Sequence, residues 1–219
     1  LWRIFHLQAI RQKSGNRWRG EMLRSAWVGA LAVLILSASV YPIMGTQDRL
    51  RDRFEGNVTP MTLDGAAYME GTTYRDAKGN VDLEADFEGI QWLRANVVGS
   101  PIILEANTPT YRWGGRVSIY TGLPSVVGWR WHQEQQRWDY RPDVGRRISD
   151  VSEIFNTLDT SVALELLIKY NVQYVYLGQL ERNYYEDDGI AKFSDSMSPY
   201  LDNVFSTNEV DVYRVNTIN

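Results

Sequence analysis

The sequence contains no cysteine and only two histidines among its 219 residues. The absence of thiols excludes disulfides, thiolate catalysis and the common cysteine-based structural zinc sites. Any fold must therefore be held by a hydrophobic core. With 44% apolar residues, the chain is long enough to form one good-sized domain and an additional segment.

Several short motifs with a known chemistry are also missing. No GxGxxG follows an expected strand, and no Walker A sequence occurs, so a dinucleotide or nucleotide site is disfavoured. No serine lies in a GxSxG nucleophile elbow, which argues against a serine hydrolase. The sequence thus excludes the most easily recognised kinds of self-sufficient catalytic site.

Charge is absent from the 21 residues 25–45, SAWVGALAVLILSASVYPIMG. At 1.5 Å per residue, this segment spans about 30 Å, the thickness of the hydrocarbon core of a bilayer. We therefore predict a transmembrane helix. A buried core helix of this length would normally show a polar face, and a signal peptide would have a shorter apolar run and fewer preceding residues.

The charges on the two sides of this segment differ in sign. Residues 1–24 carry a net charge of +5, whereas residues 46–219 carry −9. The positive-inside rule places the basic segment 1–24 in the cytoplasm and the acidic remainder outside the cell membrane. Because the sequence starts without methionine, we expect residues 1–219 to be the C-terminal part of a longer membrane protein.

Regular patterns begin after a turn-rich juxtamembrane connector, residues 46–80, and define an extracytoplasmic domain, residues 81–219. Helical periodicity is found in 82–99 and in 149–171, with a break at Asp159 that caps a second helix. Strands are expected at 101–106, 125–129 and 172–178, followed by a polar helical region and a final edge strand at 208–215. Alternating strands and helices predict an α/β class fold, a Rossmann-like sandwich with a mostly parallel sheet.

Candidate binding residues concentrate in 115–140, which holds three tryptophans, one histidine and three arginines. Flat aromatic rings can stack on sugars, and guanidinium groups can bind phosphate or carboxylate. The predicted substrate-binding residues are Glu105, Arg116, Tyr120, Trp129, His132 and Arg137. The alternatives are structural: tryptophans that fix a long loop to the sheet, and an ion pair between Glu105 and Arg112 or Arg116. On a strand, His132 and Glu134 would share a face, but two ligands are too few for a metal site.

Several blocks together resemble the Chloroflexi and archaeal YYY-type membrane protein family (DUF2298). These blocks are TLDGAAYM (62–69), ILEA (103–106), GRVSIYTGLPSVVGW (115–129), His132 with Gln135 and Arg137, and KYNVQYVYLGQLERNYY (169–185). Gln133 departs from the family pattern, in which an acidic residue follows the histidine. WDY at 138–140 matches part of the WWDYG motif of oligosaccharyltransferases, but it follows the second expected strand instead of the first, and we interpret it as coincidence.

Members of this family resemble GT-C superfamily glycosyltransferases. The resemblance implies a parent enzyme that transfers sugar from a polyprenyl-phosphate donor, with its catalytic acid on an earlier extracytoplasmic loop, so that no catalytic residue is expected in 1–219. It implies partners in the lipid bilayer, the remaining transmembrane spans, a polyprenyl-phosphate sugar and a glycan acceptor, and no nucleic acid. No cofactor or metal is expected within 1–219, and a divalent metal would bind in the missing membrane part. The alternatives are a membrane-anchored carbohydrate- or envelope-binding module and a purely structural scaffold.

Overall fold

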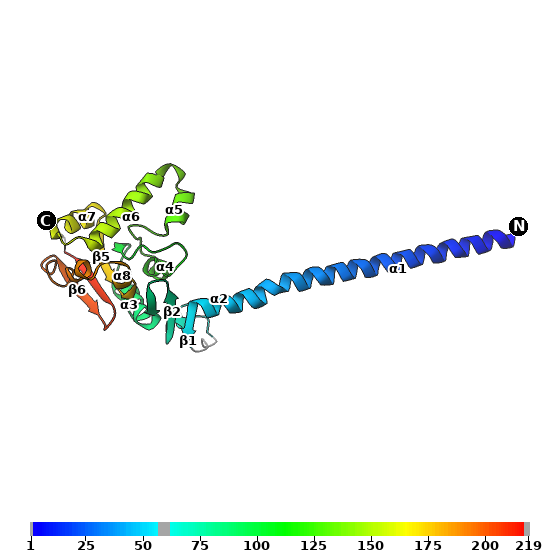
Figure 1. Ribbon diagram of the computed structural model, residues 1–219, viewed down its shortest axis with the longest axis horizontal. Coiled ribbons are helices and arrows are strands. Elements are labelled where there is room, and N and C mark those ends of the chain that lie inside the picture. The colour runs from blue at the N-terminus through cyan, green and yellow to red at the C-terminus, as the bar shows by residue number, and fades with distance from the viewer. Residues whose placement is uncertain (1, 57–61, 217–219) are drawn as a thin grey trace. The chain divides into compact units, whose positions relative to one another are not determined.

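The structure is a computed structural model that describes residues 2–56 and 62–216, with two compact units, Leu1–Asp52 and Arg53–Asn219. The expected connector 46–80 includes residues 57–61, which lie outside the described residues. The two units are considered separately below. In Figure 1 the first unit runs from dark to light blue, and the second runs from cyan to red.

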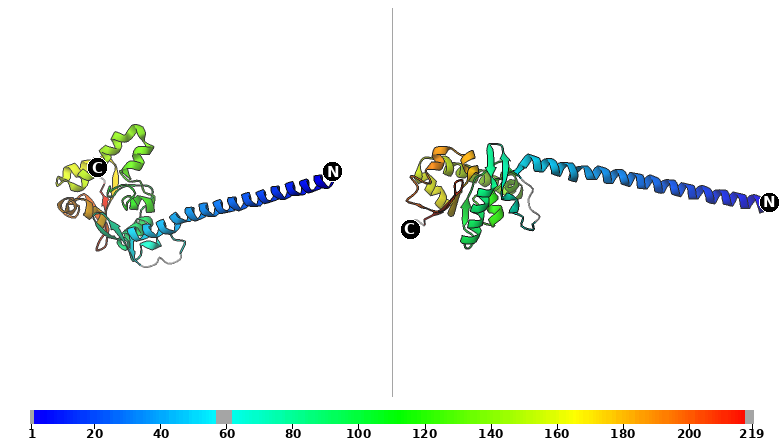
Figure 2. Two further views of the ribbon diagram at one scale, coloured as in Figure 1. Left: turned by 45° about the vertical axis from the view of Figure 1, so that its right-hand side comes forward. Right: turned by 90° about the horizontal axis from the view of Figure 1, so that it is seen from below.

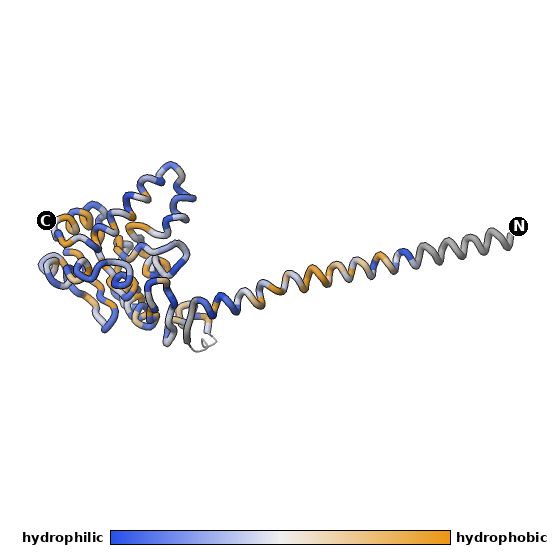
Figure 3. The backbone as a smooth tube through the Cα atoms, in the orientation of Figure 1, coloured by the Kyte–Doolittle hydropathy of each residue, from blue (hydrophilic) through white to orange (hydrophobic). Residues whose placement is uncertain are grey.

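The first unit is helical throughout its described length. Helix α1, Trp2–Val40, continues through a π-helical turn, Tyr41–Gly45, into α2, Thr46–Arg53. Pro42 has no N–H to donate to the preceding turn, and an irregular turn at this position is the expected result. The stretch Trp18–Asp52 is long and apolar enough to cross a membrane, and none of its most apolar part is buried. Figure 3 shows the hydrophobic residues of this helix in orange. The predicted span 25–45 lies within this helix.

The second unit contains a four-stranded sheet with the strand order β4-β5-β7-β6. Its strands are β4 (Ile102–Leu104), β5 (Val172–Leu177), β6 (Leu201–Ser206) and β7 (Asp211–Val215). The β4–β5 pair is parallel, and both other pairs are antiparallel. The expected mostly parallel sheet is therefore wrong, and the sheet is mixed. The physical reason is the short 207–210 connection, which can join β6 and β7 only as antiparallel neighbours.

Strand β7 is also not the edge strand that the sequence analysis predicts for 208–215. It lies between β5 and β6, and β6 forms the edge. Val212 and Tyr213 are consecutive residues of β7 that face opposite sides of the sheet, and both are buried in apolar clusters. A strand that is apolar on both faces is typical of the interior of a sheet.

The expected strand at 125–129 is absent from the described structure. Ser125 makes a single parallel bridge with Ile103, and no strand continues from it. Pro124 directly precedes this stretch and Gly128 lies within it; proline cannot donate a ladder hydrogen bond, and glycine weakens a strand interior. The chain instead forms a short bridged segment beside β4.

Helices cover both faces of the four-stranded sheet (Figures 1 and 2). One face packs on α6 (Arg141–Asn156), α7 (Thr160–Lys169) and α9 (Asp187–Ala191), and the other packs on α3 (Leu83–Asn96) and α4 (Arg116–Thr121). In β5, the alternation of Tyr174 and Tyr176 with Val175 and Leu177 supplies apolar side chains to both layers. The Asp159 carboxylate caps α7 as predicted, because it accepts hydrogen bonds from the backbone N–H groups of the first turn.

A second, antiparallel sheet has the order β1-β2-β3, with β1 at Phe54–Gly56, β2 at Thr72–Asp76 and β3 at Gly79–Asp82. Buried side chains of β2 and β3 form a separate core with α3 and with α8 (Gln179–Tyr184). The region expected to be a turn-rich connector thus contributes strands to the same compact unit as the rest of the domain.

Candidate functional site

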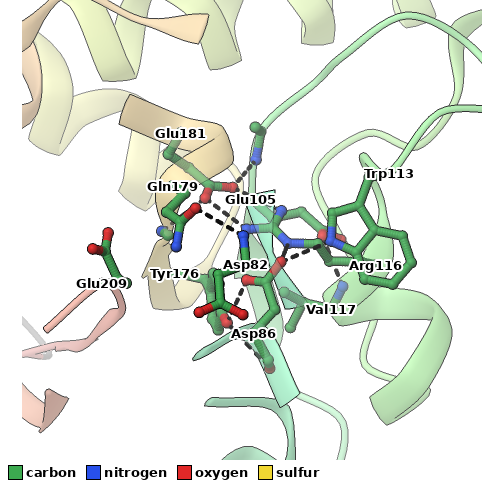
Figure 4. Close-up of polar contacts among 12 residues, drawn as sticks. Asp82, Asp86, Glu105, Trp113, Arg116, Val117, Tyr176, Gln179, Glu181 and Glu209 are labelled. Atoms are coloured by element: carbon green, nitrogen blue, oxygen red, sulfur yellow. Dashed lines mark hydrogen bonds and ion pairs between the residues drawn. The ribbon is translucent and has the colours of Figure 1, made fainter. Parts of the chain in front are cut away.

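A buried cluster of charged side chains lies at the carboxyl ends of the parallel strands β4 and β5. The Arg116 guanidinium donates to Asp86 from Nε at 2.6 Å, and to the two carboxylate oxygens of Glu181 from Nη1 at 3.2 Å and Nη2 at 2.8 Å. All three side chains are buried. Figure 4 shows them converging from α3, α4 and α8, so that one guanidinium joins three helices.

Neutral donors make additional hydrogen bonds to the two carboxylates. Trp113 donates from its indole nitrogen to Asp86 at 2.7 Å, and the Tyr176 hydroxyl donates to the other oxygen of Asp86 at 2.9 Å. Glu181 accepts from the backbone N–H groups of Ala106 and Gly178 at 2.7 and 2.8 Å. A buried ion pair of this kind is stable only when each charge has such hydrogen bonds.

Electrostatic coupling within the cluster is visible in the pKa values. Burial alone would lower the pKa of Arg116, but the carboxylates of Asp86 and Glu181 outweigh burial and hold it well above its usual value. Burial alone would raise the pKa of Glu181, but Arg116 and the backbone donors hold it below its ordinary value. Arg116 and Glu181 are therefore both charged at neutral pH.

Glu105 is a further buried carboxylate beside this cluster. It follows β4 directly and accepts hydrogen bonds from the backbone N–H groups of Val117 and Ser118 at 3.0 and 3.1 Å, at the start of α4. Burial raises the pKa of Glu105 to about 7, although Arg116 and the two N–H donors act in the opposite direction. Through its two hydrogen bonds to backbone N–H groups, the Glu105 side chain anchors α4 to the end of β4.

A second group of charged and aromatic side chains lies in the segment 130–147, at the surface of the domain. It contains α5 (Arg130–Gln136), a 3-10 turn at Trp138–Tyr140 and the first half of α6. Trp131 and Tyr140 are 51% and 63% exposed, which is unusual for side chains of this size. Figure 1 shows that α5 and α6 lie beside each other at one extremity of the second unit.

The structure divides the six predicted binding residues into three groups. Glu105 and Arg116 are buried at 1% exposure each and are bonded inside the domain, so they have no free surface for a ligand in this structure. The structural alternative proposed an ion pair of Glu105 with Arg112 or Arg116. Arg116 does form buried ion pairs, but its partners are Asp86 and Glu181, which the sequence analysis missed. Asp86 could have been noticed, because it is an acidic residue on the apolar face of the predicted helix.

Tyr120 and Trp129 are half-buried and engaged in local contacts. The Tyr120 hydroxyl lies 2.6 Å from that of Tyr68, and the Trp129 indole donates to the Gly114 carbonyl at 2.7 Å. Tyr111 packs edge-on against the Trp129 ring. The Tyr68–Tyr120 contact joins α4 to the segment before β2, whereas the contacts of Trp129 lie within the stretch between β4 and α5.

His132 and Arg137 are exposed, and a ligand-binding role for them stays a prediction. His132 Nε2 lies 3.0 Å from Nε2 of Gln136, one helical turn away. Arg130 pairs with Glu134 at 2.8 Å in the same way. Because the segment is a helix, His132 and Glu134 do not share a face as they would on a strand. Among the described residues, no group of three or more histidine or acidic side chains is placed to hold a metal ion. The side chain of His6 lies outside the described part of the structure.

A surface cavity of about 530 Å³ lies next to this exposed segment. It is lined by Arg137, Tyr140, Asp143, Val144, Arg146 and Arg147. Its volume lies in the range of small-molecule sites, about 300–1,000 Å³. The sequence analysis identified Arg137 but not Arg146 or Arg147, which lie between the segment 115–140 and the helical pattern at 149–171.

Comparison with known proteins gives little independent information. The sequence matches no family model and no curated protein. Among solved structures, the C-terminal globular domain of an oligosaccharyltransferase from Archaeoglobus fulgidus is similar over 59% of this chain and 95% of that chain, at 12% identity and a TM-score of 0.39. A similarity of this strength assigns neither a family nor a function.

Proposed function

We propose that this chain is the C-terminal membrane anchor and extracytoplasmic domain of a GT-C-type membrane glycosyltransferase that uses a polyprenyl-phosphate-linked sugar. In this proposal the domain carries no catalytic residue and helps to shape the substrate site. The observation that carries it is the helix Trp18–Asp52, apolar and exposed over a membrane-spanning length, in one chain with a compact mixed α/β unit. The resemblance to the YYY-type family adds the reaction class.

The non-catalytic role of the domain is supported by the state of its buried charges. Arg116 pairs with Asp86 and Glu181 inside the core, and Glu105 accepts hydrogen bonds from backbone N–H groups of α4. A catalytic group must instead reach substrate. The exposed segment 130–147, with its aromatic and cationic side chains, is the surface that would contact substrate or the membrane-embedded part of the parent enzyme.

A transfer assay tests the reaction. We expect the natural full-length protein in membrane vesicles to transfer sugar from a polyprenyl-phosphate donor, and Arg137→Gln to reduce transfer at least several-fold with an unchanged unfolding midpoint. Arg214→Gln removes an equally exposed charge from a pair with Asp202 on the β-sheet edge and serves as the matched control. No transfer by the full-length protein, with retained binding of a glycan, would favour the carbohydrate-binding module instead.

The orientation can be tested separately, because the chain has no native cysteine. A single cysteine at the exposed Ser198 should react with a membrane-impermeant maleimide in intact cells. A single cysteine at Ser14, in the basic segment, should react only after the cells are permeabilised. The opposite labelling pattern would place the domain in the cytoplasm and would rule out an extracytoplasmic substrate.

A further inference from the structure

The cavity beside α6 is the strongest unassigned feature of the domain. Three of its six lining residues, Arg137, Arg146 and Arg147, are arginines, against one acid, Asp143. Val144, which is buried, provides an apolar wall, and the exposed Tyr140 provides a ring and a hydroxyl. A concave site with convergent cations and an apolar wall is suited to an anionic ligand that also has an uncharged part.

The charge of this region contrasts with that of the rest of the domain. Residues 130–147 contain five arginines and three acids, a net charge of +2, whereas residues 46–219 as a whole carry −9. The other residues of that range therefore carry −11 together. The negative net charge of the domain repels anions. A local excess of arginine in a cavity therefore makes this region, in contrast to the rest of the domain, attractive to an anionic ligand.

The arginines of the cavity differ in how firmly they are held. Arg147 donates from Nη1 to the carbonyl oxygen of Val126 at 2.9 Å, and its guanidinium lies 4.9 Å from the centroid of the Tyr170 ring. These two contacts fix its position at the cavity wall. Arg146 is 59% exposed in its side chain and pairs with Asp143 one turn earlier on α6.

Asp143 is the acid against which an anionic ligand would have to compete. An exposed ion pair within one helix contributes little to stability, so Arg146 can exchange this partner at little cost. The cavity also lies at the first turn of α6, a 16-residue helix, whose N-terminus favours negative charge. A dianionic phosphate fits these donors better than a single carboxylate, because it presents more oxygens to the guanidinium groups.

We propose that this cavity binds the phosphate group of a phosphate ester, with Arg137, Arg146 and Arg147 as the donors. The ester is either a lipid-linked phosphate at the membrane surface or a soluble sugar phosphate, and both share the recognised group. This inference rests on the proposed function for the choice of these two esters. The binding itself requires no sugar transfer, so the two proposals can fail separately.

Calorimetric titration of the full chain in lipid nanodiscs tests the inference. Glucose 1-phosphate is the soluble probe, and geranyl phosphate added to the nanodiscs is the lipid probe; glucose and geraniol are the uncharged counterparts. We expect at least one phosphate ester to bind and neither uncharged compound to do so. Binding of glucose 1-phosphate alone identifies a soluble ligand, binding of geranyl phosphate alone identifies a lipid, and binding of both shows that the phosphate group is sufficient.

Variants show whether the binding occurs in this cavity. Arg137→Gln and Arg146→Gln should each weaken binding by roughly tenfold or more, because each removes a charged hydrogen bond. Asp143→Asn should strengthen it a few-fold by removing the competitor of the ligand. Arg214→Gln, the same change of charge elsewhere, should leave affinity unchanged. The inference is overturned if neither ester binds, if Arg214→Gln weakens binding as much as the cavity variants do, or if Asp143→Asn weakens it.

Discussion

Arg116 and Glu181 form a two-point ion pair inside the domain, in which both terminal nitrogens of the guanidinium donate to the two oxygens of one carboxylate, at 3.2 and 2.8 Å. The side chains have no exposed surface. The pair joins α4 to α8 across 65 residues of sequence. Loss of the Glu181 carboxylate would take from Arg116 one of its two buried carboxylate partners, which is more costly than losing the pair as a whole.

Glu181→Gln should therefore destabilise the protein by about 3–5 kcal/mol, because Arg116 would keep its charge and lose a buried carboxylate. Urea unfolding of the full chain in detergent micelles, followed by tryptophan fluorescence, measures the change. Arg214→Gln, at a pair whose side chains are 54% and 47% exposed, should cost about 0–1 kcal/mol. Equal effects of the two variants would show that the buried network does not stabilise the fold.

Glu105 should make stability depend on pH. Its pKa in the folded state, about 7, exceeds the ordinary value of 4.5, so the folded protein binds the proton more tightly than the unfolded chain does. The resulting stabilisation is fully present below pH 4.5 and is lost as the pH rises through 7, a difference of about 3 kcal/mol.

Glu105→Gln should remove this component, and the free energy of unfolding of the variant should fall less steeply between pH 4.5 and 7 than that of the wild type. Unfolding in urea at a series of pH values measures both slopes. A steeper fall in the variant, or identical slopes, would contradict the assignment of this titration to Glu105.

Two glycines in helices next to each other should respond oppositely to alanine. A Cβ atom at Gly189 in α9 would lie 2.3 Å from the backbone oxygen of Phe155, and backbone atoms cannot move aside easily. A Cβ atom at Gly145 in α6 meets nothing within 4 Å. Gly145→Ala should stabilise the protein by about 0.5–1 kcal/mol, whereas Gly189→Ala should destabilise it by several times that amount.

The measurement is the same chemical unfolding experiment, and the positions serve as controls for each other. Both changes add one methyl group to a glycine in a helix, so a general effect of alanine on helix propensity would have the same sign at both sites. A stabilising Gly189→Ala would show that α9 and α6 are not packed as closely as the structure has them.

The local elements of the domain were largely predictable from sequence, because their signals are local. The helix α3 follows from apolar spacing and the Asp82 cap, and α7 follows from the cap at Asp159. Strand β5 was recognised from its run of β-branched and aromatic residues. Each of these signals lies within about 20 residues of chain.

The arrangement of these elements was predicted less well, since it depends on pairings between distant residues. Alternating strands and helices suggested a parallel sheet. This pattern does not indicate that β7 pairs with β5 in the antiparallel direction. The carboxylates of Asp86 and Glu181 lie 30 and 65 residues from Arg116, and only the fold brings the three together. The 125–129 stretch has strand composition, but Pro124 and Gly128 outweigh it.

The central position of β7 has a consequence for how the domain is made. Strand β6 is joined to the described sheet through β7, and β5 pairs with β7 on the side away from β4. During synthesis, β5 is made before its neighbour exists, and one row of its backbone groups is then unpaired. Completion of the sheet must wait for residues 211–215, so a chain shortened before Asp211 would leave this edge of β5 exposed and able to pair with strands of other chains.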